Sequence, residues 1–262
     1  MATKIDVVEV TPTFFAKSGL SEYDSNVTPV GYSIQGDTMQ IVTIPVAPGE
    51  SIQCEPGTMC YSSKDMQATV KLGGLGRLIS GEGLFKAIYK NKGGEQGFIA
   101  LTPNTPATII PIDLDALGGS IKCKHDAFMA SINPDVKVTI SIINSNSCLA
   151  CCCSGMDVFM QDVRGTGIMF LQAHGTIMEK ELQPNEEIVV DTNCVVAVGS
   201  SVTVDVVMTG GCSVMCCSGE GCFNTTLRGP GRIILSSMPI EKLRALFPRP
   251  APRGKKDKKQ ES

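Results

Sequence analysis

From residue 32 to residue 237, short apolar and β-branched runs alternate with polar positions and are separated by Gly and Pro. A period of two is typical of strands with one buried face, and Gly/Pro clusters are typical of tight turns. The clearest strand-like runs lie at 39–46, 67–70, 136–142, 187–191 and 202–207. Many short strands joined by such turns predict an all-β fold of the sandwich or barrel kind.

Two segments depart from this pattern. In residues 237–247 a serine precedes an early proline, and Ile240, Leu243 and Leu246 recur at helical spacing. These signals predict a short C-terminal helix. Residues 83–88 also fit a single turn of helix, so we expect one there.

A short motif occurs three times along the chain. Residues 80–85 return as 154–159 and as 218–223, and a strand that begins with glycine follows each copy. The motif positions are Gly81, Glu82 and Phe85, then Gly155 and Phe159, then Gly219, Glu220 and Phe223. The glycines that open the following strands are Gly97, Gly167 and Gly231, at steps of 70 and 64 residues.

A second marker repeats out of phase with the first. Ile52, Ile121 and Ile188 each follow a turn-forming sequence, and they are separated by 69 and 67 residues. Two markers with the same period indicate one supersecondary unit in three tandem copies. We expect copies at about 31–105, 106–172 and 173–247, after an N-terminal extension of residues 1–30 that holds at most an edge strand.

Charge is distributed unevenly over the 262 residues. Residues 249–262 hold six basic and two acidic residues, a charge of +4, so the rest, with 17 basic and 24 acidic residues, carries −7. We expect residues 248–262 to be a disordered basic tail. An acidic body repels phosphate backbones, so nucleic acid is not the expected partner, while the tail suits an anionic membrane surface.

The compartment is predicted from the sequence signals that the chain lacks. No apolar run reaches the roughly 18 residues of a membrane-spanning helix, and the first residues resemble neither a secretory signal nor a transit peptide. We therefore expect a cytoplasmic protein in which the twelve cysteines are reduced. No cofactor is expected.

The cysteine clusters are the strongest candidate for metal chemistry. Cys148 and Cys151 from one cluster, with Cys216 and Cys217 from the other, would supply four thiolate ligands. In the repeat alignment, however, cysteines of both clusters occupy positions that are aliphatic in the first copy, which favours buried thiols that pack as small apolar side chains. Metal or redox chemistry, and lipidation of an exposed cluster, remain open.

No other residues form a catalytic set. His125 and His174 do not align in the repeat and are interpreted as surface or strand-end histidines, and the acidic pair Glu186–Glu187 as solvated loop charge. We therefore do not expect an enzyme. Arg164 and Arg228 precede their turns at one repeat position, where the first copy is aligned with Gly94, so a ring that binds RNA stays an alternative.

A resemblance to a known family rests on motifs that follow one another in order over about residues 30–245. The motifs are Glu55–Met59, Leu78–Phe85, Ile110–Leu114, Ala127–Ser131, Gly165–Gly167 and Leu227–Gly231. Together they resemble the family of altered inheritance of mitochondria protein 24, with its tryptophan-RNA-attenuator-like (TRAP-like) domain.

The resemblance implies an architecture and a role. It implies three tandem TRAP-like repeats of the β-sandwich or double-stranded β-helix-like kind, and a homotrimer in which nine repeats close a ring. The expected function is that of a non-catalytic assembly or interaction protein with a further protein partner, linked to membrane or mitochondrial organisation. Mitochondrion is then the alternative compartment. The competing functions are an RNA-binding ring and a cysteine-based metal or redox protein.

Overall fold

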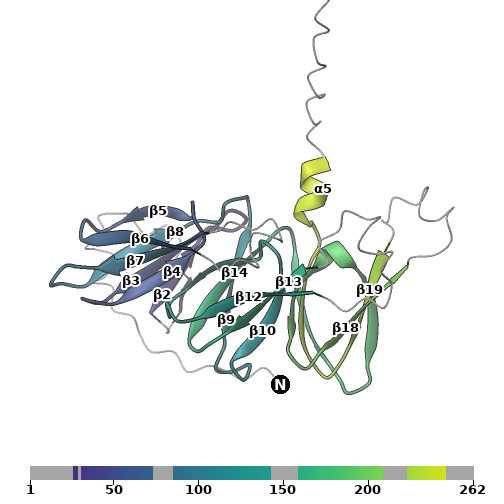
Figure 1. Ribbon diagram of the computed structural model, residues 1–262. Helices are drawn as coiled ribbons and strands as arrows, with labels where there is room; N and C mark the ends of the chain where they lie inside the picture. Colours follow the sequence, from purple (N-terminus) through teal and green to yellow (C-terminus); the bar gives the residue numbers. More distant parts are fainter. Residues whose placement is uncertain (1–25, 29–30, 73–84, 143–158, 209–222, 246–262) are drawn as a thin grey trace, which may run out of the picture.

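The computed structural model describes residues 26–28, 31–72, 85–142, 159–208 and 223–245, and within them the protein is almost wholly β (Figure 1). The first described strands are β1 (Asn26–Thr28) and β2 (Tyr32–Gln35). The expected all-β class is confirmed.

Three successive groups of six strands follow. The first group is β3 (Ile41–Val46), β4 (Ser51–Cys54), β5 (Met59–Ser62), β6 (Met66–Leu72), β7 (Phe85–Asn91) and β8 (Gly97–Leu101). The second group is β9 (Thr108–Asp113), β10 (Ser120–Lys124), β11 (Phe128–Ser131), β12 (Lys137–Ile142), β13 (Phe159–Arg164) and β14 (Ile168–Ala173). The third group is β15 (Ile177–Leu182), β16 (Glu187–Asp191), β17 (Val195–Gly199), β18 (Thr203–Met208), β19 (Phe223–Arg228) and β20 (Gly231–Ser236).

Helical structure is sparse in the described part of the chain. A 3-10 turn, η1 (Thr192–Cys194), links β16 to β17, and α5 (Ile240–Ala245) lies inside the predicted helical segment. The helical turn expected at residues 83–88 is wrong, because Phe85 begins β7, which pairs with β4 on one side and β6 on the other. Residues 83 and 84 lie outside the described residues. No described helix has the length and apolar character needed to span a membrane.

The three groups pair their strands in the same order. In each group the sixth strand pairs with the first and the third, and the fifth strand pairs with the second and the fourth. A β-bulge interrupts the third strand at the same place each time, after Met59, Phe128 and Val195. The pairing order and the bulge therefore recur three times.

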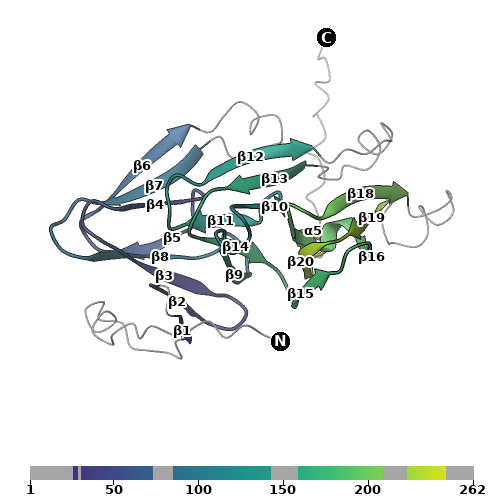
Figure 2. The ribbon, with the colours of Figure 1, turned by 90° about the horizontal axis from the view of Figure 1, so that it is seen from below.

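Neighbouring groups are joined by further strand pairing. The second strand of one group pairs with the third strand of the next, as β4 with β11 and as β10 with β17. These two junctions create two six-stranded sheets, each half from one group and half from the next. A five-stranded sheet, β1-β2-β3-β8-β5, and a three-stranded sheet, β16-β19-β18, remain at the two ends (Figures 1 and 2).

Three hydrophobic cores lie between these four sheets. The first core includes Ile44, Ile52 and Phe170; the second includes Ile121, Val163 and Leu171; the third includes Leu182, Leu227 and Ile233. In β14, Phe170 contributes to the first core, whereas its neighbours Met169 and Leu171 contribute to the second. A sheet buried on both faces has apolar residues on both faces of its strands, which explains the unbroken apolar run of residues 168–171 in β14.

Close packing requires glycine at the start of two of the sixth strands. A Cβ atom on Gly97 would lie 2.6 Å from the Ser63 hydroxyl oxygen, and one on Gly231 would lie 2.6 Å from that of Ser201. Gly167 has more space, but its φ of +82° favours glycine. The turn before the fourth strand thus leaves no room for a side chain in two of the three groups.

We expect Phe170→Ala to destabilise the fold by about 3–5 kcal/mol, the usual cost of truncating a buried aromatic side chain. Phe170 is fully buried, and its ring packs edge-on against that of Tyr32, 5.0 Å between centroids. Denaturant titration measures the free energy of unfolding. Met178→Ala on β15 is the control, since its side chain is 49% exposed and should change stability by less than about 0.5 kcal/mol. Equal effects of the two variants would contradict the assigned core.

Candidate functional site

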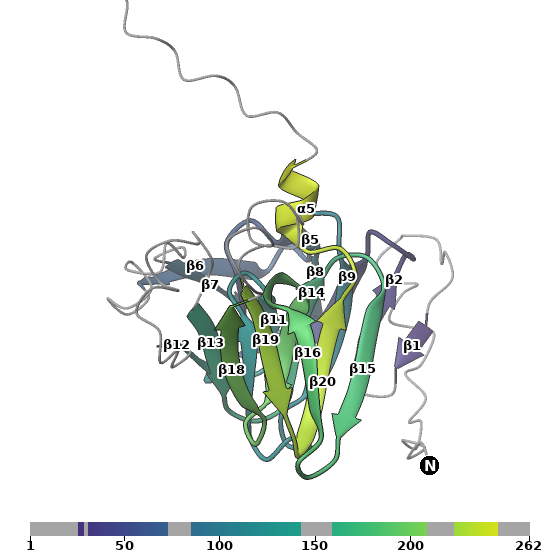
Figure 3. The same cartoon turned by 90° about the vertical axis from the view of Figure 1, so that its right-hand side faces the viewer.

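Two strands at opposite ends of the molecule lack the neighbour that their counterparts have. Among the described residues, β5 is the only third strand without a second strand beside it, and β16 is the only second strand without a third strand beside it. We call β5 and β16 the open edges. Figure 3 views the molecule from the end that carries β16.

The open edges carry exposed apolar side chains. Met59 on β5 is 42% exposed and Val189 on β16 is 63% exposed, and the Cys60 thiol on β5 is also exposed. The edge strand β15 differs, because Arg232 binds Glu179 at 2.6 Å and Lys180 binds Glu186 at 2.9 Å along it. Charged side chains on a strand that stays at the edge of a sheet prevent it from pairing with another chain. The middle of each open edge has no such charge.

Inside the chain, each junction is sealed by polar contacts as well as by strand pairing. At the first junction, buried Gln53 donates hydrogen bonds from Nε2 to the Ser131 hydroxyl, at 2.9 Å, and to the Val136 carbonyl oxygen, at 2.7 Å. At the second junction, Lys124 donates from Nζ to the Asn193 carbonyl oxygen at 3.3 Å. These bonds satisfy polar groups that the junctions bury.

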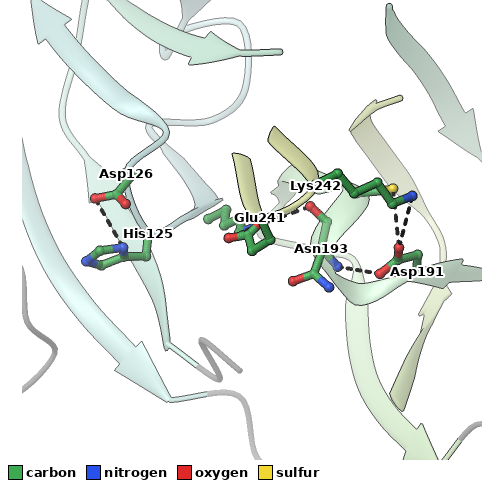
Figure 4. Close-up of polar contacts among 8 residues, drawn as sticks. His125, Asp126, Asp191, Asn193, Glu241 and Lys242 are labelled. Carbon is green, nitrogen blue, oxygen red and sulfur yellow. Dashed lines mark hydrogen bonds and ion pairs between the residues drawn. The ribbon is translucent and has the colours of Figure 1, made fainter. Parts of the chain in front are cut away.

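A second candidate site is a polar cluster beside α5 at the second junction (Figure 4). Lys124 Nζ lies 3.0 Å from the Glu241 carboxylate, and Lys242 Nζ lies 3.6 Å from Asp191. The side chains of Lys124 and Glu241 are 17% and 34% exposed, so this pair is partly shielded from water. The two ion pairs fasten the short helix to β10 and to the end of β16.

Both histidines lie next to this cluster, and each directly follows a strand. His125 Nδ1 lies 3.1 Å from Asp126. Burial raises the pKa of Asp126, but its hydrogen bond to His125 and the charges of His125, Arg244 and Lys124 outweigh this and lower the pKa overall. His174 Nε2 is hydrogen-bonded to the Thr105 hydroxyl at 2.8 Å. Burial lowers the pKa of His174, against an opposing effect of the Glu241 carboxylate.

The ion pairs of this cluster hold α5 in place, and we call them the α5 clamp. The side chains of Lys124, Asp191, Glu241 and Lys242 neutralise one another in ion pairs. No group of three His, Cys, Asp or Glu side chains suited to a metal ion occurs among the residues that the structure describes. The arrangement therefore attaches α5 to the sheets. A small pocket beside it is lined by Lys124, by both histidines and by Ile240 of the helix.

All four cysteines of the predicted metal site lie outside the described residues. This applies to Cys148, Cys151, Cys216 and Cys217, and also to the motif positions Gly81, Glu82, Gly155, Gly219 and Glu220. The remaining motif residues, Phe85, Phe159 and Phe223, begin β7, β13 and β19.

Among the described cysteines, Cys54 and Cys123 are buried apolar positions in the first and second cores. Burial raises the pKa of the Cys54 thiol to about 11, with a smaller opposing effect of a hydrogen bond to Thr58. A thiol that stays protonated at neutral pH is a poor nucleophile and a poor metal ligand.

The predicted alignment of the basic positions needs one correction. Arg164 and Arg228 pair on the ladder with the first residues of β10 and β16, and the residue paired with the first residue of β4 is Lys90, not Gly94. The loop after β7 is longer than those after β13 and β19. Counting residues back from the turn therefore aligns the wrong residue of the first group with Arg164 and Arg228. Each group thus carries a cation at this position. Two of them are held by carboxylates, Arg164 by Asp162 and Arg228 by Glu187, both at 2.6 Å.

Sequence reasoning missed both the open edges and the α5 clamp. The bulge positions of the three third strands, Cys60, Met129 and Val196, share no residue type, so only the ladder register aligns them. The acidic pair Glu186–Glu187 was interpreted as loop charge. Glu186 does lie before β16 and accepts a hydrogen bond from the Gln183 backbone nitrogen at 2.8 Å. Glu187 is not a loop residue, because it begins β16 and binds Arg228 at 2.6 Å.

Together these features define an all-β protein of stacked antiparallel sheets, in which consecutive strand groups share sheets across junctions. The chain belongs to the family described as mitochondrial biogenesis AIM24, whose model matches residues 32–238. The resemblance seen in the sequence is therefore confirmed.

Two streptococcal proteins are similar to the chain. It is 26% identical over 224 residues to the uncharacterised protein M6_Spy0233 of Streptococcus pyogenes serotype M6, with 81% of this chain and 87% of that protein covered. The crystal structure of protein SPYM3_0169 from Streptococcus pyogenes superposes with a TM-score of 0.65 and 25% identity. That match covers 82% of this chain and 96% of the other.

We expect the stability of the protein to fall when the pH drops from about 7 to about 5, and to fall less in His174→Gln. The folded-state pKa of His174 lies below its ordinary 6.5, so the unfolded chain binds more protons in this range and stability rises with pH. Denaturant titration at both pH values measures the difference. Thr105→Val is the control, because it removes the hydroxyl partner but keeps the imidazole. An unchanged pH dependence in His174→Gln would contradict this assignment.

Proposed function

We propose that this protein is a non-catalytic assembly protein that closes into a ring of three subunits through its open edges. The observation that carries the proposal is the pair of complementary half-sheets at the ends of the chain. Within the described part of the chain, one half-sheet ends in a third strand without a second strand beside it, β5, and the other ends in a second strand without a third strand beside it, β16. Strands of these two kinds pair at both internal junctions.

The proposed number of subunits rests on the repeat together with the family resemblance. The threefold recurrence of strand pairing supports three tandem TRAP-like repeats, with bounds near 31–105, 106–172 and 173–247. A chain with one open strand of each kind forms a head-to-tail contact, which gives a closed ring when the rotation per subunit divides a full turn. The family resemblance favours nine repeats in the ring, and thus three chains.

A ring of this kind is suited to presenting a rigid surface to other molecules. The family description, mitochondrial biogenesis, supports a mitochondrial role. We propose that this role is in membrane organisation and involves a further protein partner. The composition of residues 248–262, with a charge of +4, supports contact of the basic tail with an anionic membrane surface. The ion-paired groups around α5 favour a structural role over catalysis.

Mass photometry of the full-length protein should show particles of about three times the 27.8 kDa chain mass. Cys60→Asp should raise the dissociation constant of the assembly by about 100-fold or more, since a charge buried without a partner costs several kcal/mol. Val70→Asp is the matched control: Val70 on β6 is 61% exposed and lies on no open edge. A wild-type protein that stays at the mass of one chain at micromolar concentration would contradict the proposed assembly.

An RNA-binding ring is the second candidate, and the cations Lys90, Arg164 and Arg228 favour it, because each strand group supplies one at the same ladder position. Phosphate contacts would make affinity fall steeply with salt, by about 0.7 in log K per log unit of salt for each phosphate neutralised on a single strand. In filter binding with a random single-stranded RNA at about 50–200 mM salt, we expect no retention.

Retention with a steep salt slope, lost when Lys90, Arg164 and Arg228 are all replaced by Gln, would instead establish the RNA function. Retention that survives this triple replacement would place the binding elsewhere, with the basic tail as the next segment to remove.

A further inference from the structure

The two internal junctions use one register. At the first junction Ala130 lies opposite Cys54, and at the second Ala197 lies opposite Cys123. In each case the residue directly after the bulge of the third strand faces the fourth residue of the second strand. The residues that hold these positions on the open edges are Tyr61 on β5 and Val190 on β16.

Each junction also inserts side chains of one group into the core of the group before it. Met129 and Ala130, from the second group, belong to the first core, and Val196 and Ala197, from the third group, belong to the second core. The bulge explains why two consecutive residues point to the same side of the sheet. Their counterparts on β5 are Cys60 and Tyr61.

Among the residues that the structure describes, none is inserted into the third core in this way, and the second strand of that core is less covered. Ile52 and Ile121 are 2% and 1% exposed, but their counterpart Ile188 is only partly buried. Cys54 and Cys123 are 1% and 0% exposed, and their counterpart Val190 is again only partly buried. The third core is therefore open at the place where the other two cores are closed by the next group.

The side chains on β5 have the volume to close it. At the first junction the ladder pair is Ala130 with Phe170, and on the open edge it is Tyr61 with Ala100. Each pair consists of one aromatic residue and one alanine. The aromatic residue lies on the sixth strand in the first pair and on the third strand in the second pair. Cores tolerate such exchanges when the total volume is kept. Ala100 is already fully buried, so Cys60 and Tyr61 supply the new contact.

We infer that β5 of a second copy of this chain pairs antiparallel with β16 in the internal register, with Tyr61 opposite Val190 and Ser62 opposite Val189. Cys60 and Tyr61 of that copy then complete the third core. The inference rests on the proposed function, since it specifies the contact that closes the ring. The resulting sheet would continue β18-β19-β16 with β5-β8-β3, the strand order of the two six-stranded sheets.

Disulfide trapping tests the register. In a Cys60→Ser, Cys194→Ser background of the full-length chain, Tyr61→Cys is combined with Val190→Cys, and the oxidised protein is analysed by peptide mapping. Directly opposite residues have Cβ atoms about 4.5–5.5 Å apart, close to disulfide range, whereas diagonal neighbours are about 7–8 Å apart. Val190→Cys introduces the residue that the other two groups have at this position. The out-of-register control combines Tyr61→Cys with Ile188→Cys.

We expect an intermolecular bond between positions 61 and 190 at a yield about 10-fold or more above that between positions 61 and 188. Mass photometry of the reduced proteins shows in parallel whether each variant still assembles. Assembled protein that links 61 to 188 preferentially, or links neither pair, overturns the register while the proposed ring stands. Folded but unassembled wild-type protein overturns both.

Discussion

The structure depends on main-chain hydrogen bonding between the second strand of one group and the third strand of the next. Without the β4–β11 and β10–β17 pairs, each group would be a small sandwich with two bare edges, and its core would lack the side chains that the next group inserts. Bare edges pair with other chains, and small cores supply little stability. The junctions solve both problems together, because the same strand covers an edge and places Met129 or Val196 in the neighbouring core.

How much of this could be predicted depends on whether a position is constrained within one group or between groups. The sequence alone revealed the repeated glycines near the start of the sixth strands and the repeated isoleucines of the second strands. Steric crowding at Gly97 and Gly231, and burial at Ile52 and Ile121, allow few other residue types at these positions. The all-β class followed from the alternating pattern. These constraints act on single residues, so they leave a trace that can be read in one sequence.

Constraints that are shared between residues leave no such trace. Tyr61 with Ala100 and Ala130 with Phe170 fill similar space, yet no residue type is retained at either position. The prediction of a helical turn at residues 83–88 is wrong for a related reason. The local pattern fits a helix, but the pairing of β7 with β4 and β6 determines the structure of the described part of this segment. The Lys124–Glu241 clamp joins residues far apart in the chain, and no spacing rule connects them.

The charges of the molecule are arranged in keeping with a chain whose two ends meet. Where an edge remains exposed, as on β15, ion pairs such as Arg232 with Glu179 line it, whereas Met59, Cys60 and Tyr61 on β5, and Ile188, Val189 and Val190 on β16, are uncharged. If both open edges faced water permanently, these segments would invite non-specific pairing, and a charged residue at either would cost little. In the proposed assembly each uncharged edge would be covered by the other. The absence of charge on these edges and the partial burial of Val190 would then have one common explanation, a neighbouring strand from another subunit.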